Sequence, residues 1–318
     1  GRTGAGVASL FNLLEEVVIR RTRPFIRKAY PNATIKGKKI SFPERKLRTV
    51  RYDLEGTYQG IYEKIVSGVE SLKLAPYNLE SYKKDKAKVD DFEAGREEAL
   101  VGIFKSRYLK RFESSIDSFR ISIRRALELQ KNFESTLLGG RLLASSDFQK
   151  ALRYLTREDE EDDATPGSIA DDFDASEDAK AIVDSLPEVN TSDYDLKKLH
   201  DALQHDIDVL TDIWHKIKDI RSEGDAKLAR LKELLLGDLK GQKVLIFTYY
   251  KDTARYLFRE LGSEKGESFR RSLGDVNIHR MDSGAKVEER SKIIRGFAPK
   301  ANGHEEIQGT EDEIDILI

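Results

Sequence analysis

Cysteine is absent from this chain of 318 residues, and methionine and tryptophan occur once each. Without cysteine there are no disulfide bonds and no thiolate metal ligands, and a reducing compartment is compatible with the composition. No apolar run reaches membrane-spanning length, and no signal peptide is recognisable. We therefore expect a protein without membrane partners, located in the cytoplasm.

Histidine is also scarce, with five residues in the whole chain. His200 and His205 fall on one predicted helix, but no third ligand lies near them in the sequence, so surface positions are expected rather than a metal site. Charge is abundant instead: charged residues make up 35% of the chain and hydrophobic residues 39%. This composition favours a polar, helix-rich protein, and the length is typical of two domains.

The small net charge of −2 conceals two halves of opposite sign. Residues 1–155 contain 31 Lys and Arg and 19 Asp and Glu, a net charge of +12, whereas the remainder contains 24 and 38, a net charge of −14. A basic half is typical of proteins that bind polyanions. Solvated helical faces would produce the same imbalance, and charge alone does not separate the two interpretations.

The stretch at residues 243–253 organises the C-terminal part of the chain. Its four consecutive apolar residues, 244–247, predict a strand covered on both faces, as in a parallel sheet. Asp252 or Thr253 can cap the helix that follows, whose apolar residues recur at helical spacing up to Leu261. Gly262 favours the end of that helix.

The same unit recurs downstream. Val276, Ile278 and Met281 frame a second strand, Val287–Phe297 has the apolar spacing of a second helix, and residues 315–318 predict a third strand. The order β-α-β-α-β predicts an α/β fold with a parallel sheet, preceded by a large helical region.

Parallel sheets of this kind bind ligands beyond the carboxyl ends of their strands, where helix N-termini favour phosphate. Residues 248–253 and 283–286 are two such helix starts, expected on one rim of the sheet after neighbouring strands. The alternative is that both are ordinary connecting loops without a ligand.

Three arginines near the beginning, Arg20, Arg21 and Arg23, form a compact cationic group. They could bind phosphate bidentately or pair with carboxylates of a neighbouring lobe. Further on, Val50, Tyr52 and Leu54 alternate with polar residues, which predicts a strand.

The region from residue 55 to residue 222 has mostly helical spacing. Helices are predicted from residue 55 to 69, around residues 100–108, from Ser114 or Ser115 to the pair Gly139-Gly140, and from residue 196 to 220. Basic residues lie on the side opposite the apolar stripe in two of them: Lys105, Arg107, Lys110, Arg111, Arg120, Arg124, Arg125 and Lys131. They could follow a nucleic-acid backbone or form solvated faces. Residues 158–178 are strongly acidic and predict a mobile insertion that is dispensable for folding.

Several motifs, taken in order, resemble a known family. They are Asp-Ala-Lys-Leu at 225–228, Lys-Val-Leu-Ile-Phe-Thr at 243–248, Asp-Thr at 252–253, His-Arg-Met-Asp-Ser-Gly at 279–284, and Glu-Glu-Arg at 288–290 with Phe297. This order is similar to the start of the second RecA-like lobe of superfamily 2 helicases, in the Swi/Snf-type ATPase branch. Residues 18–23 resemble the segment that closes the first lobe, and residues 109–115 with Phe119 resemble the helical insertion between the lobes.

The resemblance implies a division into three parts. Residues 1–54 correspond to the end of the first RecA-like lobe, residues 55–222 to the helical insertion with an acidic disordered segment near 157–195, and residues 223–318 to the first half of the second lobe. The chain has no Gly-x-x-x-x-Gly-Lys-Ser/Thr phosphate loop and no Asp-Glu box for Mg²⁺. We therefore expect an internal fragment, with ATP and Mg²⁺ bound only by the intact protein.

The resemblance also implies a partner, double-stranded DNA held by its backbone, and it assigns roles to individual residues. The residues expected to face phosphate are Thr248, Lys251, Thr253, Ser283, Gly284 and Arg290; for Arg290, bracing of the loop is the alternative. Arg20, Arg21 and Arg23 are expected at the junction of the lobes. The helical insertion could also bind proteins, and a rival hypothesis is a non-catalytic helical scaffold with a small α/β appendage.

Overall fold

The computed structural model divides the chain into two compact units, Gly1–Arg51 and Tyr52–Ile318. The structure describes residues 22–35, 37–39, 41–143, 188–282 and 284–318. In the first unit, Thr22 caps helix α2 (Arg23–Ala29) by accepting a hydrogen bond from the Phe25 amide at 3.3 Å. Strands β1 (Thr34–Ile35) and β2 (Lys38–Lys39) then form a small antiparallel hairpin.

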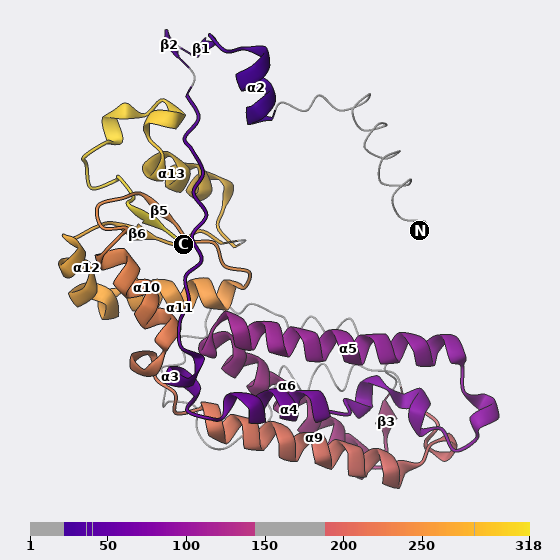
Figure 1. Ribbon diagram of the computed structural model, residues 1–318. Helices are drawn as coiled ribbons and strands as arrows, with labels where there is room; N and C mark the ends of the chain where they lie inside the picture. The colour runs from indigo at the N-terminus through magenta and orange to yellow at the C-terminus, as the bar shows by residue number, and fades with distance from the viewer. Residues whose placement is uncertain (1–21, 36, 40, 144–187, 283) are drawn as a thin grey trace. The chain divides into compact units, whose positions relative to one another are not determined.

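The second unit is mostly helical and carries a small parallel three-stranded sheet (Figure 1). The helices of its first part are α3 (Leu54–Tyr58), α4 (Tyr62–Ser71), α5 (Asp91–Ser114), α6 (Ile116–Leu138) and α9 (Leu196–Ile217). Helix α6 packs along both α5 and α9, and α4 packs against both of these partners. The helices thus form a bundle, in which their apolar stripes face one another.

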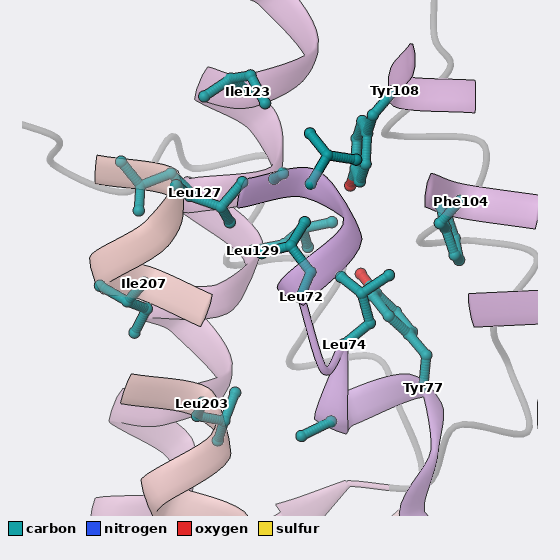
Figure 2. Packing of buried hydrophobic residues seen from close by; sticks show 14 of the residues in the cluster. Leu72, Leu74, Tyr77, Phe104, Tyr108, Ile123, Leu127, Leu129, Leu203 and Ile207 are labelled. Atoms are coloured by element: carbon teal, nitrogen blue, oxygen red, sulfur yellow. The ribbon is translucent and has the colours of Figure 1, made fainter. Parts of the chain in front are cut away.

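The bundle is held together by one large hydrophobic core. Its residues come mainly from α4, α5, α6 and α9 and from the connection between α4 and α5. Among them are Leu72, Leu74, Tyr77, Phe104, Tyr108, Ile123, Leu127, Leu129, Leu203 and Ile207 (Figure 2). Tyr77 stacks on Phe104 with ring centroids 4.9 Å apart. Burial raises the pKa of the Tyr108 hydroxyl, which lies within this core. The apolar stripes read from the sequence are therefore core residues.

Two predictions for residues 50–69 are wrong. The expected strand at Val50, Tyr52 and Leu54 is absent, because Asp53 accepts a hydrogen bond from the Glu55 amide at 3.0 Å and starts helix α3 instead. The helix expected from residue 55 to 69 is interrupted after Tyr58, since Gln59 adopts a left-handed backbone conformation with φ of 47°. A residue with a left-handed backbone conformation does not continue a right-handed helix, so α3 ends at this point.

The connection from α4 to α5 has a regular structure of its own. It forms short 3₁₀ helices at Leu79–Tyr82 and Lys86–Lys88, and the buried Glu80 accepts a hydrogen bond from the Asp90 amide at 2.9 Å. Asp90 in turn caps α5. Further along, Ser115 caps α6, which confirms one of the two alternatives predicted for that helix start.

A second, smaller hydrophobic core lies around the sheet. Strands β5 (Val244–Leu245), β6 (Ile278–His279) and β7 (Ile316–Leu317) are parallel and ordered β5-β7-β6. The helices of this part are α10 (Ala226–Leu236), α11 (Lys251–Leu261), α12 (Glu267–Leu273) and α13 (Val287–Phe297). The predicted β-α-β-α-β order is present, and α12 is an additional helix between β5 and β6.

One face of strand β5 is open, contrary to the prediction that both faces are covered. Val244 and Ile246 pack into the core formed with α10, α11 and α12. On the opposite side, Ile293 of α13 packs against Leu317 of β7, while Leu245 is exposed and Phe247 is 86% exposed. An apolar run does not distinguish a strand buried on both faces from one buried on a single face, because both sets of side chains are apolar.

The predicted acidic insertion lies mostly outside the described residues. Strands β3 (Leu142–Leu143) and β4 (Glu188–Val189) flank the gap in the described residues and pair in antiparallel orientation. Residues 158–178 fall within the gap between these strands. The predicted boundaries at residues 54 and 222 stay a prediction.

Candidate nucleic-acid interface

The predicted phosphate-binding rim corresponds to the carboxyl edge of the three-stranded sheet. Strands β5 and β6 are both parallel to β7, so the segments that follow them emerge at the same edge. The two strands had been expected to be neighbours. They are not, because β7 lies between them. Helices α11 and α13 begin close to this edge, and neither has a side-chain N-cap.

An ion pair joins the two segments across the edge. The Lys251 ammonium lies 3.6 Å from Oδ1 of Asp282, and both side chains are largely buried, with exposures of 9% and 11%. The other carboxylate oxygen of Asp282 lies 3.1 Å from Nε of Arg280. Asp282 thus holds two cations at the rim, and its charge offsets part of theirs.

Beside this ion pair lies a pocket of about 250 Å³. It is lined by Leu245, Ile246, Phe247, Thr248, Tyr249, Tyr250, Lys251, Ala254, Met281, Asp282, Leu317 and Ile318. Tyr249 is 85% exposed and meets Tyr250 edge to face, with ring centroids 4.9 Å apart. The rim therefore combines apolar and aromatic surface with a cationic group.

The Thr248 hydroxyl and the Gly284 amide are both engaged in hydrogen bonds within their own turns. The Thr248 hydroxyl donates to the Tyr250 carbonyl at 3.0 Å, which shapes the turn into α11. The Gly284 amide donates to Oδ1 of Asp282 at 2.8 Å, in the turn that precedes α13. Ser283 lies outside the described residues. Of the predicted amide donors, that of Gly284 is thus already bonded to a carboxylate.

Thr253 does not lie on the open rim, in contrast to its predicted role. It is buried, and its hydroxyl lies 2.8 Å from Oγ of Ser114 and 3.0 Å from Oγ of Ser115. Asp252 is buried as well and forms an ion pair with Arg111 of α5. The predicted capping by Asp252 or Thr253 is therefore wrong: Tyr250 occupies the N-cap position of α11, and the two polar side chains bind the tip of the α5–α6 hairpin.

The other predicted residues are Arg290 and the three arginines near the beginning of the chain. Arg290 is half-buried in the first part of α13. Arg23 is exposed on α2 in the first unit, with its guanidinium 5.7 Å from the Phe42 ring centroid. Arg20 and Arg21 lie outside the described residues.

The basic stripes of α5 and α6 are not continuous solvent-facing surfaces. Arg111, Arg120 and Arg125 are buried. Arg120 donates to the Ile220 carbonyl at 2.5 Å, and burial lowers its pKa. Helical spacing placed these arginines opposite the apolar stripe, but a bundle helix in contact with several neighbours has more than one buried face.

Sequence reasoning missed three features of the site: Asp282, Arg111 and the exposed aromatic rings. For Asp282 a signal existed, because Asp followed two residues later by Gly is typical of a turn in which the carboxylate accepts from the backbone. For the pairing of Arg111 the sequence contains no such signal. Its partner Asp252 lies 141 residues away in the sequence.

The sequence has no phosphate loop, and the described part of the structure contains no group of three or more His, Asp or Glu side chains placed to hold a metal ion. Within the same residues no helix combines the length and apolarity needed to cross a membrane. Compared with known proteins, the chain matches no family model, no curated protein and no solved structure.

Proposed function

We propose that this chain is part of an ATP-dependent nucleic-acid translocase of the Swi/Snf type and binds the backbone of double-stranded DNA. In this proposal the sheet and α10–α13 are the first half of a RecA-like lobe, and the helical bundle is the insertion that precedes it. ATP and Mg²⁺ belong to the intact protein. This chain contributes the grip on the nucleic acid.

One observation carries the proposal: the Lys251 ammonium lies at the carboxyl edge of a parallel sheet, where two helices of eleven residues each begin. Helix N-termini and a lysine are suited to a phosphate group and carry no base readout. Asp282 limits the local positive charge and keeps Lys251 oriented toward the edge. Binding would then be blind to sequence and dependent on salt.

The test compares two lysines on either side of β5 in the sequence. Lys243 precedes the strand, and Lys251 follows it at the start of α11. Lys251→Ala removes the cation at the carboxyl edge. Lys243→Ala is the matched control, since Lys243 precedes β5 and is also ion-paired, to Glu313 at 2.8 Å. Binding of fluorescent duplex DNA is measured by anisotropy over a salt series, with single-stranded DNA and RNA as further probes.

We expect Lys251→Ala to lower the slope of log affinity against log salt by roughly one unit and Lys243→Ala to leave it unchanged. At 0.1 M salt one such contact corresponds to about a tenfold loss of affinity. Equal slopes for wild type and both variants would refute the proposal that this edge binds nucleic acid.

A protein-interaction scaffold is the second candidate function. It is favoured by the open apolar face of β5, where Leu245 and Phe247 are exposed, and by the extent of the helical bundle. Patches of this kind mark protein interfaces when they are large. The same binding assay separates the two functions, because a scaffold has no salt-dependent affinity that disappears with Lys251.

A further inference from the structure

The turn that carries Lys251 is held on both sides by one residue of the helical bundle. Arg111 forms an ion pair with Asp252, which follows Lys251, and its guanidinium carbon lies 4.8 Å from the ring centroid of Tyr250, which precedes it. Arg111 and Asp252 are 4% and 2% exposed. The contact is therefore shielded from solvent.

The tip of the α5–α6 hairpin, residues 111–118, also binds the next residue of α11. The hydroxyls of Ser114 and Ser115 lie 2.8 and 3.0 Å from that of Thr253. The tip itself is internally fixed, because Nε of Arg111 donates to the Ser118 carbonyl at 3.1 Å and Ser115 caps α6. Arg111 thus links the end of α5, the start of α6 and the start of α11.

These contacts are polar, although they lie between two hydrophobic cores. The bundle core and the sheet core are separate clusters. A buried ion pair contributes little net stability compared with apolar residues of the same volume, but it requires a defined geometry. A planar guanidinium that pairs with a carboxylate and stacks on a ring fixes the direction of both partners.

We infer that Arg111 is a positioning residue for the rim: it fixes the turn at Tyr250–Asp252 so that the Lys251 ammonium stays at the carboxyl edge of the sheet. The inference rests on the proposed function of that edge. Arg111 does not contact phosphate itself, because its buried side chain is already committed to Asp252, Tyr250 and Ser118. Its effect on binding therefore passes through Lys251.

A double-mutant cycle tests this dependence. Arg111→Met, Lys251→Ala and the double variant are compared in duplex binding over a salt series. We expect Arg111→Met to lower the salt slope by up to roughly one unit, and to have no further effect when Lys251 is already replaced. A direct phosphate contact by Arg111 would instead give additive losses.

Hydrogen exchange supplies a readout that is independent of nucleic acid. In Arg111→Met the amides of residues 248–254 should exchange at least several-fold faster than in wild type. Arg120→Met is the matched control, since Arg120 is also buried in the bundle but bonds to the carbonyls of Ile217 and Ile220 and pairs with Asp117 of α6. That variant should leave both the salt slope and the exchange of residues 248–254 unchanged.

Arg111→Met leaves Asp252 without its buried partner, so folding could fail. Two milder variants then replace it: Arg111→Lys, which keeps the charge but loses the planar stacking, and Thr253→Val, which removes only the hydroxyl contacts. Each should shift slope and exchange in the same direction by a smaller amount.

The inference is overturned if Arg111→Met, Arg111→Lys and Thr253→Val all keep the wild-type hydrogen exchange and salt slope. Additive losses in the double-mutant cycle would overturn it as well. Failure of the proposed function is a different outcome. In that case Lys251→Ala has no effect on the slope, while the exchange of residues 248–254 still reports whether Arg111 positions the turn.

Discussion

At the scale of single residues, the turn that follows α4 depends on Asp206. Its carboxylate accepts hydrogen bonds from the amides of Lys73 and Leu74 at 2.7 and 2.6 Å, and Leu74 has a positive φ of 50°. Burial raises the pKa of Asp206, while the two amide donors act in the opposite direction. One side chain of α9 thereby holds the backbone that connects α4 to α5.

Replacement of Asp206 by Ala should destabilise the protein by about 3 kcal/mol, because it leaves two backbone amides without an acceptor in or near the core. Asp208→Ala is the control on the same helix. Asp208 is exposed and accepts only from Gln204, so its loss should cost about 0.5 kcal/mol or less. Urea unfolding followed by circular dichroism measures both, and equal losses would contradict the role given to Asp206.

At the scale of elements, the start of β5 is fastened to the loop that leads into β7. The Glu313 carboxylate lies 2.8 Å from the Lys243 ammonium and accepts the Gly309 amide at 2.6 Å. The Lys243 hydrogen bond and the Gly309 amide lower the pKa of Glu313 below its usual 4.5. A carboxylate with a lowered pKa stabilises the fold fully above its unfolded pKa and loses that contribution as the pH falls.

The wild-type protein should therefore have a higher melting temperature than Glu313→Gln at pH 7. The difference in melting temperature should shrink as the pH falls below 4.5. Thermal unfolding of both proteins between pH 7 and pH 3.5 measures this. Glu311→Gln, on the same loop and exposed, reports the effect of removing a charge alone. A difference in melting temperature that does not change with pH would show that the ion pair contributes no pH dependence.

At the scale of the whole molecule, polar contacts connect the bundle core of the second unit to the core around its sheet. Besides the Arg111–Asp252 pair, Arg259 of α11 lies 3.2 Å from Asp117 of α6, and the Ala226 amide donates to the Thr57 hydroxyl at 2.9 Å. The Lys227 ammonium donates to the Ser114 carbonyl at 2.8 Å. These hydrogen bonds and ion pairs fix the position of the sheet core relative to the bundle core.

The chain as a whole should not hydrolyse ATP. It has no phosphate loop to hold β- and γ-phosphates and no Asp-Glu box for Mg²⁺. A phosphate-release assay on the purified chain with saturating duplex DNA should give the rate of the buffer control. Turnover above that control would contradict the expectation and would require a different nucleotide site.

Much of the local structure could be predicted because its causes are local. Four features follow from neighbours a few residues apart: the apolar spacing of α9, α11 and α13, the cap at Ser115, the end of α11 at Gly262, and the alternation of strands and helices along the chain. Where a competing local cap existed, as at Asp53, alternation alone predicted the wrong element.

Tertiary structure alone decided which polar residues are buried and what they bind. Arg111 and Asp252 are 141 residues apart, and nothing in either neighbourhood marks them as a pair. The position of β7 between β5 and β6 and the open face of β5 likewise depend on how distant segments pack. Periodicity encodes which side of an element is apolar, whereas the partners of a buried charge are determined only once the elements meet.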